Sequence, residues 1–98
     1  MSYVGSPDIV SKAFFTVKGS TIVDFLVDGV NTSCGFKTIS LPSARILSRG
    51  RVNEGFVPVP GLDDIITLRG RFANRVFTGI VREGPLCSVA VRVRLTPA

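Results

Sequence analysis

Arginine side chains recur at alternate positions in short apolar segments of this sequence. Arg92 and Arg94 alternate with valines near the end of the chain, and Arg69 and Arg71 occupy alternate positions in an earlier apolar segment. Because successive side chains of a β-strand point to opposite faces, each pair predicts two guanidinium groups on one exposed face. A planar guanidinium can bind a phosphate through two parallel hydrogen bonds. The pattern therefore indicates a cationic surface that fits a phosphate backbone.

A third group of arginines and the overall charge support the same interpretation. Arg45, Arg49 and Arg51 share one parity in a segment that also contains apolar residues. The chain has 98 residues and a net charge of +5, and the excess lies after Phe36, where arginine is the main cation. The alternative is that arginine simply covers apolar surface at exposed strand positions. Composition alone leaves both interpretations open.

The segments between turn signals are typical of strands, and none is a convincing helix. We expect strands at 13–17, 21–27, 35–41, 44–52, 64–72, 76–81 and 88–95. Residues 53–62 contain two prolines, which cannot donate to a β-ladder, and are expected to form an extended connection or an edge. This spacing predicts one all-β domain over residues 1–98, a small barrel or sandwich. The leading candidate is a five-stranded antiparallel barrel of the oligonucleotide-binding (OB) type with protruding hairpins.

The two cysteines and the start of the chain bear on its location. Cys34 and Cys87 are the only cysteines, and the chain contains no histidine, so an ordinary zinc site is excluded. We expect both thiols to be reduced and packed in the interior, because structural disulfides are rare in the cytosol. The first residues lack the basic and apolar regions of a signal peptide, and no apolar run is long enough to cross a membrane. These features predict a cytoplasmic protein without a membrane partner.

The sequence offers little for catalysis. There is no histidine to act as a general base and no glycine-rich phosphate loop of the Gly-x-x-x-x-Gly-Lys type. Asp63 and Asp64 are adjacent, which places their side chains on opposite sides of an extended backbone and favours a role in a turn or at the start of a strand. We therefore expect no catalytic residues, no cofactor and no metal site.

The end of the chain resembles a known family. Residues 92–98, Arg-Val-Arg-Leu-Thr-Pro-Ala, resemble the Arg-Leu-Arg-Leu-Val-Pro-Ala ending of the single-stranded-DNA-binding proteins of filamentous phages, the gene V type. Residues 54–55 and 60–62 are similar to the Glu-Gly and Pro-Gly-Leu of that family. Residues 72–77 are similar to its hairpin with two phenylalanines. The resemblance covers roughly the last half of the chain, and the family's DNA-stacking tyrosines have no counterpart, since Tyr3 is the only tyrosine.

The resemblance implies a five-stranded OB-type barrel that forms a homodimer and coats single strands cooperatively. In that family the protein covers newly made viral strands during replication in the bacterial host and holds them for packaging. Arg92 and Arg94 fall on two arginines of which at least one lies along the DNA path, and Arg49 falls on a DNA-binding lysine. Phe77 falls on a phenylalanine that stacks on bases or contacts a neighbouring dimer.

Charge pattern and resemblance together give one predicted set of DNA-binding residues. The set is Arg45, Arg49, Arg51, Arg69, Arg71, Arg92, Arg94, Lys18, Lys37, Phe36, Phe56 and Phe77. We expect a protein that binds single-stranded DNA without sequence preference. Two alternatives remain open at this point, because arginine stripes do not by themselves identify the partner. One is a viral structural or assembly subunit whose arginine-bearing strands pair with neighbours, and the other is a small duplex- or RNA-binding regulator.

Overall fold

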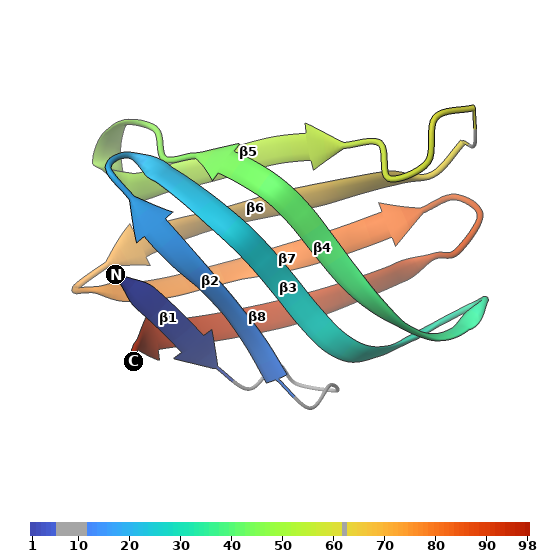
Figure 1. Ribbon diagram of the computed structural model, residues 1–98, viewed down its shortest axis with the longest axis horizontal. Helices are drawn as coiled ribbons and strands as arrows, with labels where there is room; N and C mark the ends of the chain where they lie inside the picture. The colour runs from blue at the N-terminus through green and yellow to red at the C-terminus, as the bar shows by residue number, and fades with distance from the viewer. Residues whose placement is uncertain (6–11, 62) are drawn as a thin grey trace.

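Strands make up nearly all of the regular structure of this chain. The computed structural model describes residues 1–5, 12–61 and 63–98 (Figure 1). The strands are β1 (Ser2–Gly5), β2 (Lys12–Lys18), β3 (Thr21–Thr32), β4 (Gly35–Arg45), β5 (Arg51–Phe56), β6 (Ile65–Ala73), β7 (Val76–Gly84) and β8 (Val89–Pro97). One short 3-10 turn, η1 (Ser48–Gly50), separates β4 from β5. No α-helix occurs in the described part of the chain, so the predicted all-β class is confirmed.

The strands form a single antiparallel sheet that curls into a nearly closed barrel. Their order is β4-β3-β2-β1-β8-β7-β6-β5, so the first and last strands of the chain pair with each other. An isolated bridge between Ile46 and Val52 brings the two outer strands together. The prediction of five strands is wrong, because eight form and follow one another around the barrel in chain order. The OB-fold is also a small barrel but has a Greek-key connection.

The predicted end of one strand is wrong for a local reason. We expected a strand to stop before Pro42, but β4 continues through this residue to Arg45. On β3, Asp24 has a φ of 55° and lies opposite Pro42, between the pairs Val23–Ser43 and Phe25–Leu41. Asp24 and Pro42 are not among the paired residues of this ladder, so the missing N–H of Pro42 is not needed there.

The expected connection over residues 53–62 is also shorter than predicted. Its first part belongs to β5, in which Asn53 pairs with Arg69 and Phe56 pairs with Ile66. The two prolines lie beyond the end of this strand, so they do not interrupt its ladder. Leu62, which belongs to one of the motifs of the phage resemblance, lies outside the described residues.

The inward-facing side chains build one apolar core. Tyr3, Phe15, Phe25 and Phe77 are buried and belong to it, and Phe72 packs against them. The ring centroids of Phe72 and Phe77 are 5.0 Å apart, and those of Phe15 and Phe77 are 5.4 Å apart. Such aromatic pairs add stability beyond the burial of their surface. The aromatic residues near the β6–β7 hairpin are therefore mainly structural.

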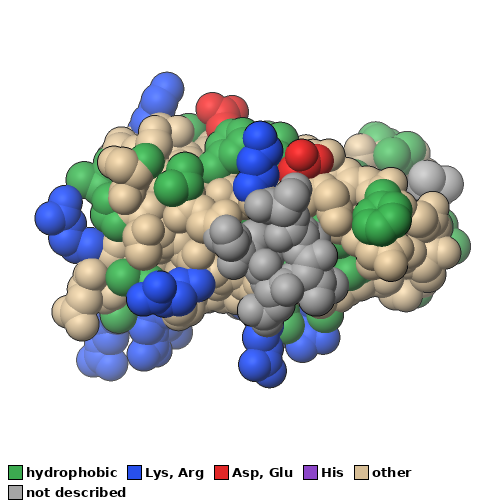
Figure 2. Space-filling view, turned by 90° about the horizontal axis from the view of Figure 1, so that it is seen from below, with side chains coloured by type: hydrophobic (Ala, Val, Ile, Leu, Met, Phe, Trp, Pro, Cys, Tyr) green, Lys and Arg blue, Asp and Glu red, His purple; other side chains and the backbone are tan. Residues whose placement is uncertain are grey.

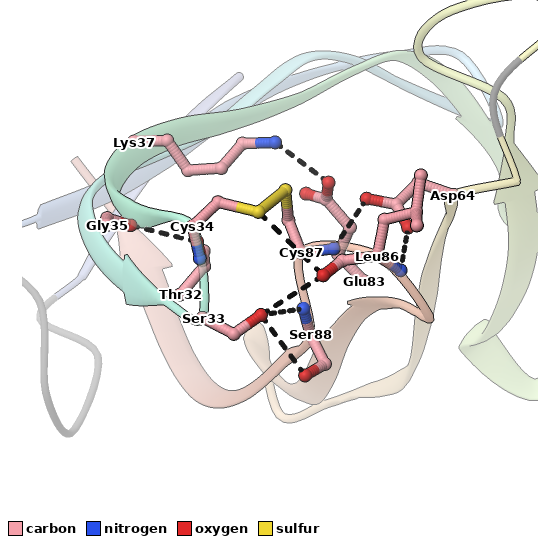
Figure 3. The surroundings of a disulfide bond; sticks show 10 residues. All are labelled: Thr32, Ser33, Cys34, Gly35, Lys37, Asp64, Glu83, Leu86, Cys87 and Ser88. Carbon is pink, nitrogen blue, oxygen red and sulfur yellow. Dashed lines mark hydrogen bonds and ion pairs between the residues drawn. A yellow bond between two sulfur atoms is a disulfide. The ribbon is translucent and has the colours of Figure 1, made fainter.

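A disulfide joins Cys34 to Cys87, which contradicts the expectation of two reduced thiols (Figure 3). Cys34 lies in the turn between β3 and β4, and Cys87 lies in the loop between β7 and β8. Ser33 in the same turn donates a hydrogen bond to the carbonyl of Leu86 and accepts one from the N–H of Ser88. Barrel closure brings these loops together across 53 residues of sequence, a proximity that the spacing of the cysteines could not reveal.

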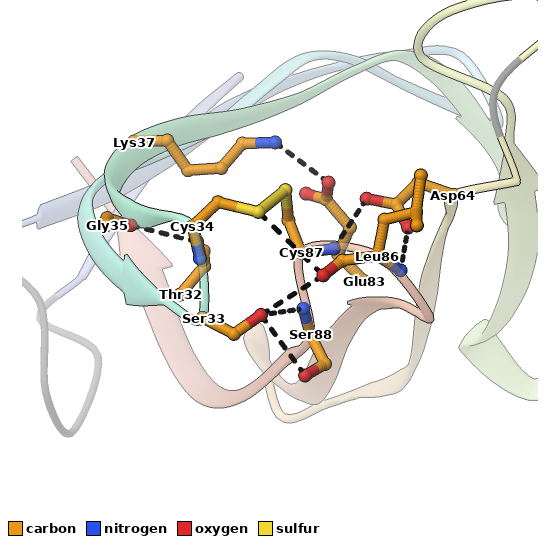
Figure 4. Close-up of polar contacts among 10 residues, drawn as sticks. All are labelled: Thr32, Ser33, Cys34, Gly35, Lys37, Asp64, Glu83, Leu86, Cys87 and Ser88. Carbon is orange, nitrogen blue, oxygen red and sulfur yellow. Dashed lines mark hydrogen bonds and ion pairs between the residues drawn. A yellow bond between two sulfur atoms is a disulfide. The ribbon is translucent and has the colours of Figure 1, made fainter.

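Buried polar groups stabilise the end of the barrel at which the Cys34–Cys87 disulfide lies (Figure 4). The carboxylate of Asp64 accepts hydrogen bonds from the backbone N–H groups of Leu86 and Cys87. Burial opposes the charge of Asp64, but these hydrogen bonds, with help from Glu83 and Lys37, outweigh that effect and lower its pKa. Asp64 thus fixes the loop that carries Cys87, which agrees with its predicted role in a turn.

Replacing Asp64 by asparagine is expected to lower the melting temperature at pH 7 and to flatten its decrease in acid. The lowered pKa of Asp64 means that the folded state favours the carboxylate. Its contribution is therefore present above the ordinary pKa of 3.8 and is lost as the pH falls through the lower pKa of the folded state. Thermal unfolding at pH 7, 5 and 3, followed by circular dichroism, measures both effects. A variant as stable as the parent at pH 7 would contradict this role.

Within residues 1–5, 12–61 and 63–98, no helix is long and apolar enough to cross a membrane.

Candidate nucleic-acid interface

The register of β5 to β8 places arginines from different strands on one outer face. Arg51 of β5 lies opposite Arg71 of β6, which lies opposite Thr78 of β7. Thr78 in turn lies opposite Arg94 of β8. Directly paired residues of antiparallel strands project to the same side of the sheet. These side chains therefore form one row across four strands.

A second row runs parallel to the first. It consists of Asn53, Arg69, Ile80 and Arg92, again one residue from each of β5 to β8. Residues two positions apart in a strand are about 6.6 Å apart, so the two rows are close neighbours. A third row adds Arg82, which pairs with residues of β6 and β8 on the same side. The arginine face is defined here as Arg51, Arg69, Arg71, Arg82, Arg92 and Arg94.

Every side chain of the arginine face is exposed, and the face carries no acidic residue. Glu54 and Glu83, the acidic residues of β5 and β7, have the opposite parity. Glu83 is buried, and the carboxylate of Glu54 accepts a hydrogen bond from the backbone N–H of Arg45. The only salt bridge found in the described part of the chain joins Lys37 to Glu83 inside the barrel. In Figure 2 several basic side chains project along the lower margin, the side that corresponds to the rear of Figure 1, where β6 to β8 lie, and others project at the upper and left margins. The guanidinium groups are thus available to an external anion.

Three of these arginines border a shallow pocket of about 360 Å³. The pocket is lined by Leu47, Arg51, Val52, Asn53, Arg69, Gly70 and Arg71. Like charges that lie directly opposite each other destabilise a sheet, and Arg51 faces Arg71 in this way. A bound anion would relieve this repulsion. The pocket therefore brings three guanidinium groups to the border of one cavity.

The remaining predicted basic residues do not belong to the outer rows of β5 to β8. Lys18 pairs with Thr21, which pairs with Arg45, so these two cations belong to the wall formed by β2 to β4. Arg49 lies in η1, where its backbone has a φ of 63°. The ammonium group of Lys37 donates to Glu83 at 2.8 Å, and the Glu83 side chain is only 1% exposed. The prediction that Lys37 contacts DNA is wrong, because an internal carboxylate holds its charge.

The prediction that Phe77 stacks on bases is also wrong. Its side chain is fully buried at 0% exposure, although it lies next to the β6–β7 turn. Gly70 and Gly79 make the room for its ring, because a Cβ at Gly70 would come within 2.5 Å of the ring atom Cζ. Phe77 is therefore a core residue and cannot contact a strand outside the barrel.

The other two nominated phenylalanines do not lie on the arginine face. Phe56 pairs with Ile66 on the inner side of β5 and is half-buried against the core. Phe36 is 78% exposed but pairs with Asn31 in the β3–β4 hairpin, on the other wall of the barrel. The structure thus brings together five of the predicted arginines and none of the predicted aromatic residues.

A Phe77→Leu variant separates the structural role from a DNA-binding role. Loss of ring contacts in the core is expected to lower the free energy of unfolding by about 1 to 1.5 kcal/mol. Affinity for a single-stranded oligonucleotide is expected to stay within twofold of the parent. Chemical denaturation and fluorescence titration measure the two quantities. A large loss of affinity at unchanged stability would contradict the core assignment.

Sequence reasoning missed Arg82, because the strand expected over residues 76–81 ends one residue before it. The strand β7 continues to Gly84, and Arg82 shares the parity of Thr78 and Ile80 within it. That parity was the available signal, but the Glu-Gly-Pro that follows Arg82 is typical of a turn. The turn lies later, at the loop that carries Cys87.

A cluster of potential metal ligands lies at the disulfide end of the barrel. The ligand atoms of Asp64, Glu83 and Cys87 all lie within 4.8 Å of one another. The sulfur of Cys87 is bonded to Cys34, and the ammonium of Lys37 neutralises Glu83. The arrangement is explained by its role in holding the loop.

Comparison with known proteins adds no relationship to these observations. No protein-family model matches the chain, and neither the curated proteins nor the solved structures contain a significant match.

Proposed function

We propose that this protein binds single-stranded DNA without sequence preference and coats viral strands in the manner of the filamentous-phage proteins that its C-terminal residues resemble. The single observation that carries the proposal is the arginine face, six exposed guanidinium groups without an acidic neighbour on the same face. Such a surface attracts a polyanion and gains affinity from the release of counterions. The absence of a recognisable catalytic set in the sequence agrees with a binding function.

The shape of the face favours a flexible strand over a duplex. The arginines lie on the outer side of a barrel wall, which curves away from any ligand placed on it. Duplex DNA is stiff over about 150 base pairs and meets a convex surface over a short length. A single strand can bend to follow the rows of arginines. The same number of cations can therefore reach more phosphates of a single strand.

The proposal includes a homodimer that assembles cooperatively along DNA. One feature of the barrel supports self-association. β4 and β5 are the two outer strands of the sheet, and between them the ladder has only the Ile46–Val52 bridge. Free strand edges are sites at which a second chain can pair. Oligonucleotide binding, the role of OB-folds, fits a small all-β barrel. The strands here follow one another in chain order, whereas those of an OB-fold include a Greek-key connection.

Titration with fluorescent oligo-dT at several salt concentrations tests the proposal. If six phosphates are neutralised, the logarithm of affinity should fall with the logarithm of salt with a slope of about −4. Competition by duplex DNA and by RNA of equal length is expected to be weaker than competition by unlabelled oligo-dT. Failure to bind oligo-dT, or an affinity independent of salt, would contradict the proposal. Preferential binding of a duplex would favour the regulatory alternative.

A further inference from the structure

The outer side of β5 to β8, which carries the arginine face, contains no aromatic side chain. The other residues on this side share the parity of the arginines and are all small, polar or aliphatic. They are Asn53, Gly55, Ile65, Thr67, Ala73, Val76, Thr78, Ile80, Gly84, Ala90 and Thr96. Proteins that bind single strands without sequence preference usually combine a cationic groove with aromatic side chains on which bases stack. Here the first component is present and the second is missing from the same surface.

None of the aromatic side chains projects from the outer side of β5 to β8. Five of them, Tyr3, Phe15, Phe25, Phe72 and Phe77, form the core cluster or pack against it. Phe56 has the inward parity of β5. Phe36 lies on the outer side of β4, on the other wall of the barrel. Phe14 lies on the outer side of β2, in register with Thr96 of β8 through Val4 of β1. A strand would have to run past β8 and across β1 to stack on Phe14.

The spacing of the guanidinium groups suits a chain of phosphates. Arg69 and Arg71 follow each other along β6, and Arg92 and Arg94 do so along β8, with Thr78 between the two pairs. Each guanidinium offers a planar fork that matches two phosphate oxygens. Adjacent cations without carboxylate partners repel each other, so the face is most stable when phosphates lie between them. The pattern repeats along two strands, as a repeating ligand requires.

We infer that the arginine face binds the phosphodiester chain itself and that stacking of bases contributes little to its affinity. The inference rests on the proposed function and specifies the part of the nucleic acid that the site recognises. It explains how a protein without exposed tyrosines can bind every sequence alike. It also differs from what the phage resemblance implied, in which aromatic side chains contact the bases.

An abasic strand provides the test. Fluorescein-labelled oligo-dT and a strand of equal length built from abasic deoxyribose phosphates carry the same phosphates, and only the first carries bases. Both are titrated at low salt with the parent and with the variant Arg69→Ala/Arg71→Ala/Arg92→Ala/Arg94→Ala. The parent is expected to bind the two strands with affinities within threefold of each other. The variant is expected to lose affinity for both by the same factor.

The possible outcomes separate this inference from the proposed function. A single base stacked on an aromatic side chain would be worth at least about fivefold in affinity. Preference of the parent for oligo-dT by tenfold or more would overturn the inference and leave the proposed function intact. Bases that stack on guanidinium planes would also produce such a preference, so the comparison measures every contribution of the bases to affinity. If the parent binds neither strand, both the inference and the proposed function are wrong.

Discussion

Replacing Arg69, Arg71, Arg92 and Arg94 together by alanine is expected to weaken binding to oligo-dT about a thousandfold at low salt. Each exposed guanidinium–phosphate contact contributes about 1 kcal/mol, and four of them contribute about 4 kcal/mol. Every 1.4 kcal/mol corresponds to about tenfold in affinity. Fluorescence anisotropy of labelled oligo-dT measures the loss. Because all four side chains are exposed, the variant should unfold at nearly the same temperature as the parent.

Two double variants provide a matched control for net charge. Arg92→Ala/Arg94→Ala and Lys12→Ala/Lys18→Ala each remove two positive charges, but the lysines are exposed at the two ends of β2, on the other wall. The arginine pair is expected to cost about thirtyfold in affinity, the square root of the effect of the quadruple variant. The lysine pair is expected to cost less than threefold. Equal losses from the two pairs would mean that binding follows net charge and not the arginine face.

Removal of the Cys34–Cys87 disulfide is expected to lower the free energy of unfolding by about 4 kcal/mol. The bond closes a loop of 53 residues, and the restriction of the unfolded chain grows with the logarithm of loop length. The loss is a large part of the stability of a domain of this size. Urea denaturation of the parent and of Cys34→Ser/Cys87→Ser measures it.

The reducing agent supplies the control for this prediction. Dithiothreitol should destabilise the parent to nearly the level of the double serine variant and leave that variant unchanged. If the oxidised parent and the double serine variant unfold at the same urea concentration, the disulfide does not form or does not stabilise the barrel. The arginine face does not include either cysteine, so the folded variant should keep its affinity for oligo-dT.

For arginines that alternate with apolar residues, the sequence correctly predicted the side of the strand on which they lie. The alternation of Arg92 and Arg94 with buried valines predicted the outward parity that β8 has in the barrel. The same holds for Arg69 and Arg71 on β6. Parity is a local property of a strand, and it follows from the pleat of the backbone. The convergence of β5, β6 and β8 on one face depends on sheet order, which alternation does not encode.

Features that depend on contacts between distant segments were missed. Phe77 was nominated for stacking from the resemblance to the phage family, but its burial depends on Gly70 and Gly79, which leave room for its ring. Lys37 was counted as an exposed cation, whereas its partner Glu83 lies 46 positions away in the chain. The extra strand β1 is only four residues long and is stabilised by pairing with β2 and β8. None of these partners could be read from local pattern.

Nuclear magnetic resonance of the arginine side chains during titration with oligo-dT is the most direct test of the proposed interface. The Nε–H signals of Arg51, Arg69, Arg71, Arg82, Arg92 and Arg94 report on the arginine face, and that of Arg45 reports on the wall formed by β2 to β4. We predict that the six signals of the face shift progressively as DNA is added, while the signal of Arg45 shifts little. Shifts confined to Arg45 and the strands β2 to β4, with the six signals unchanged, would contradict the account.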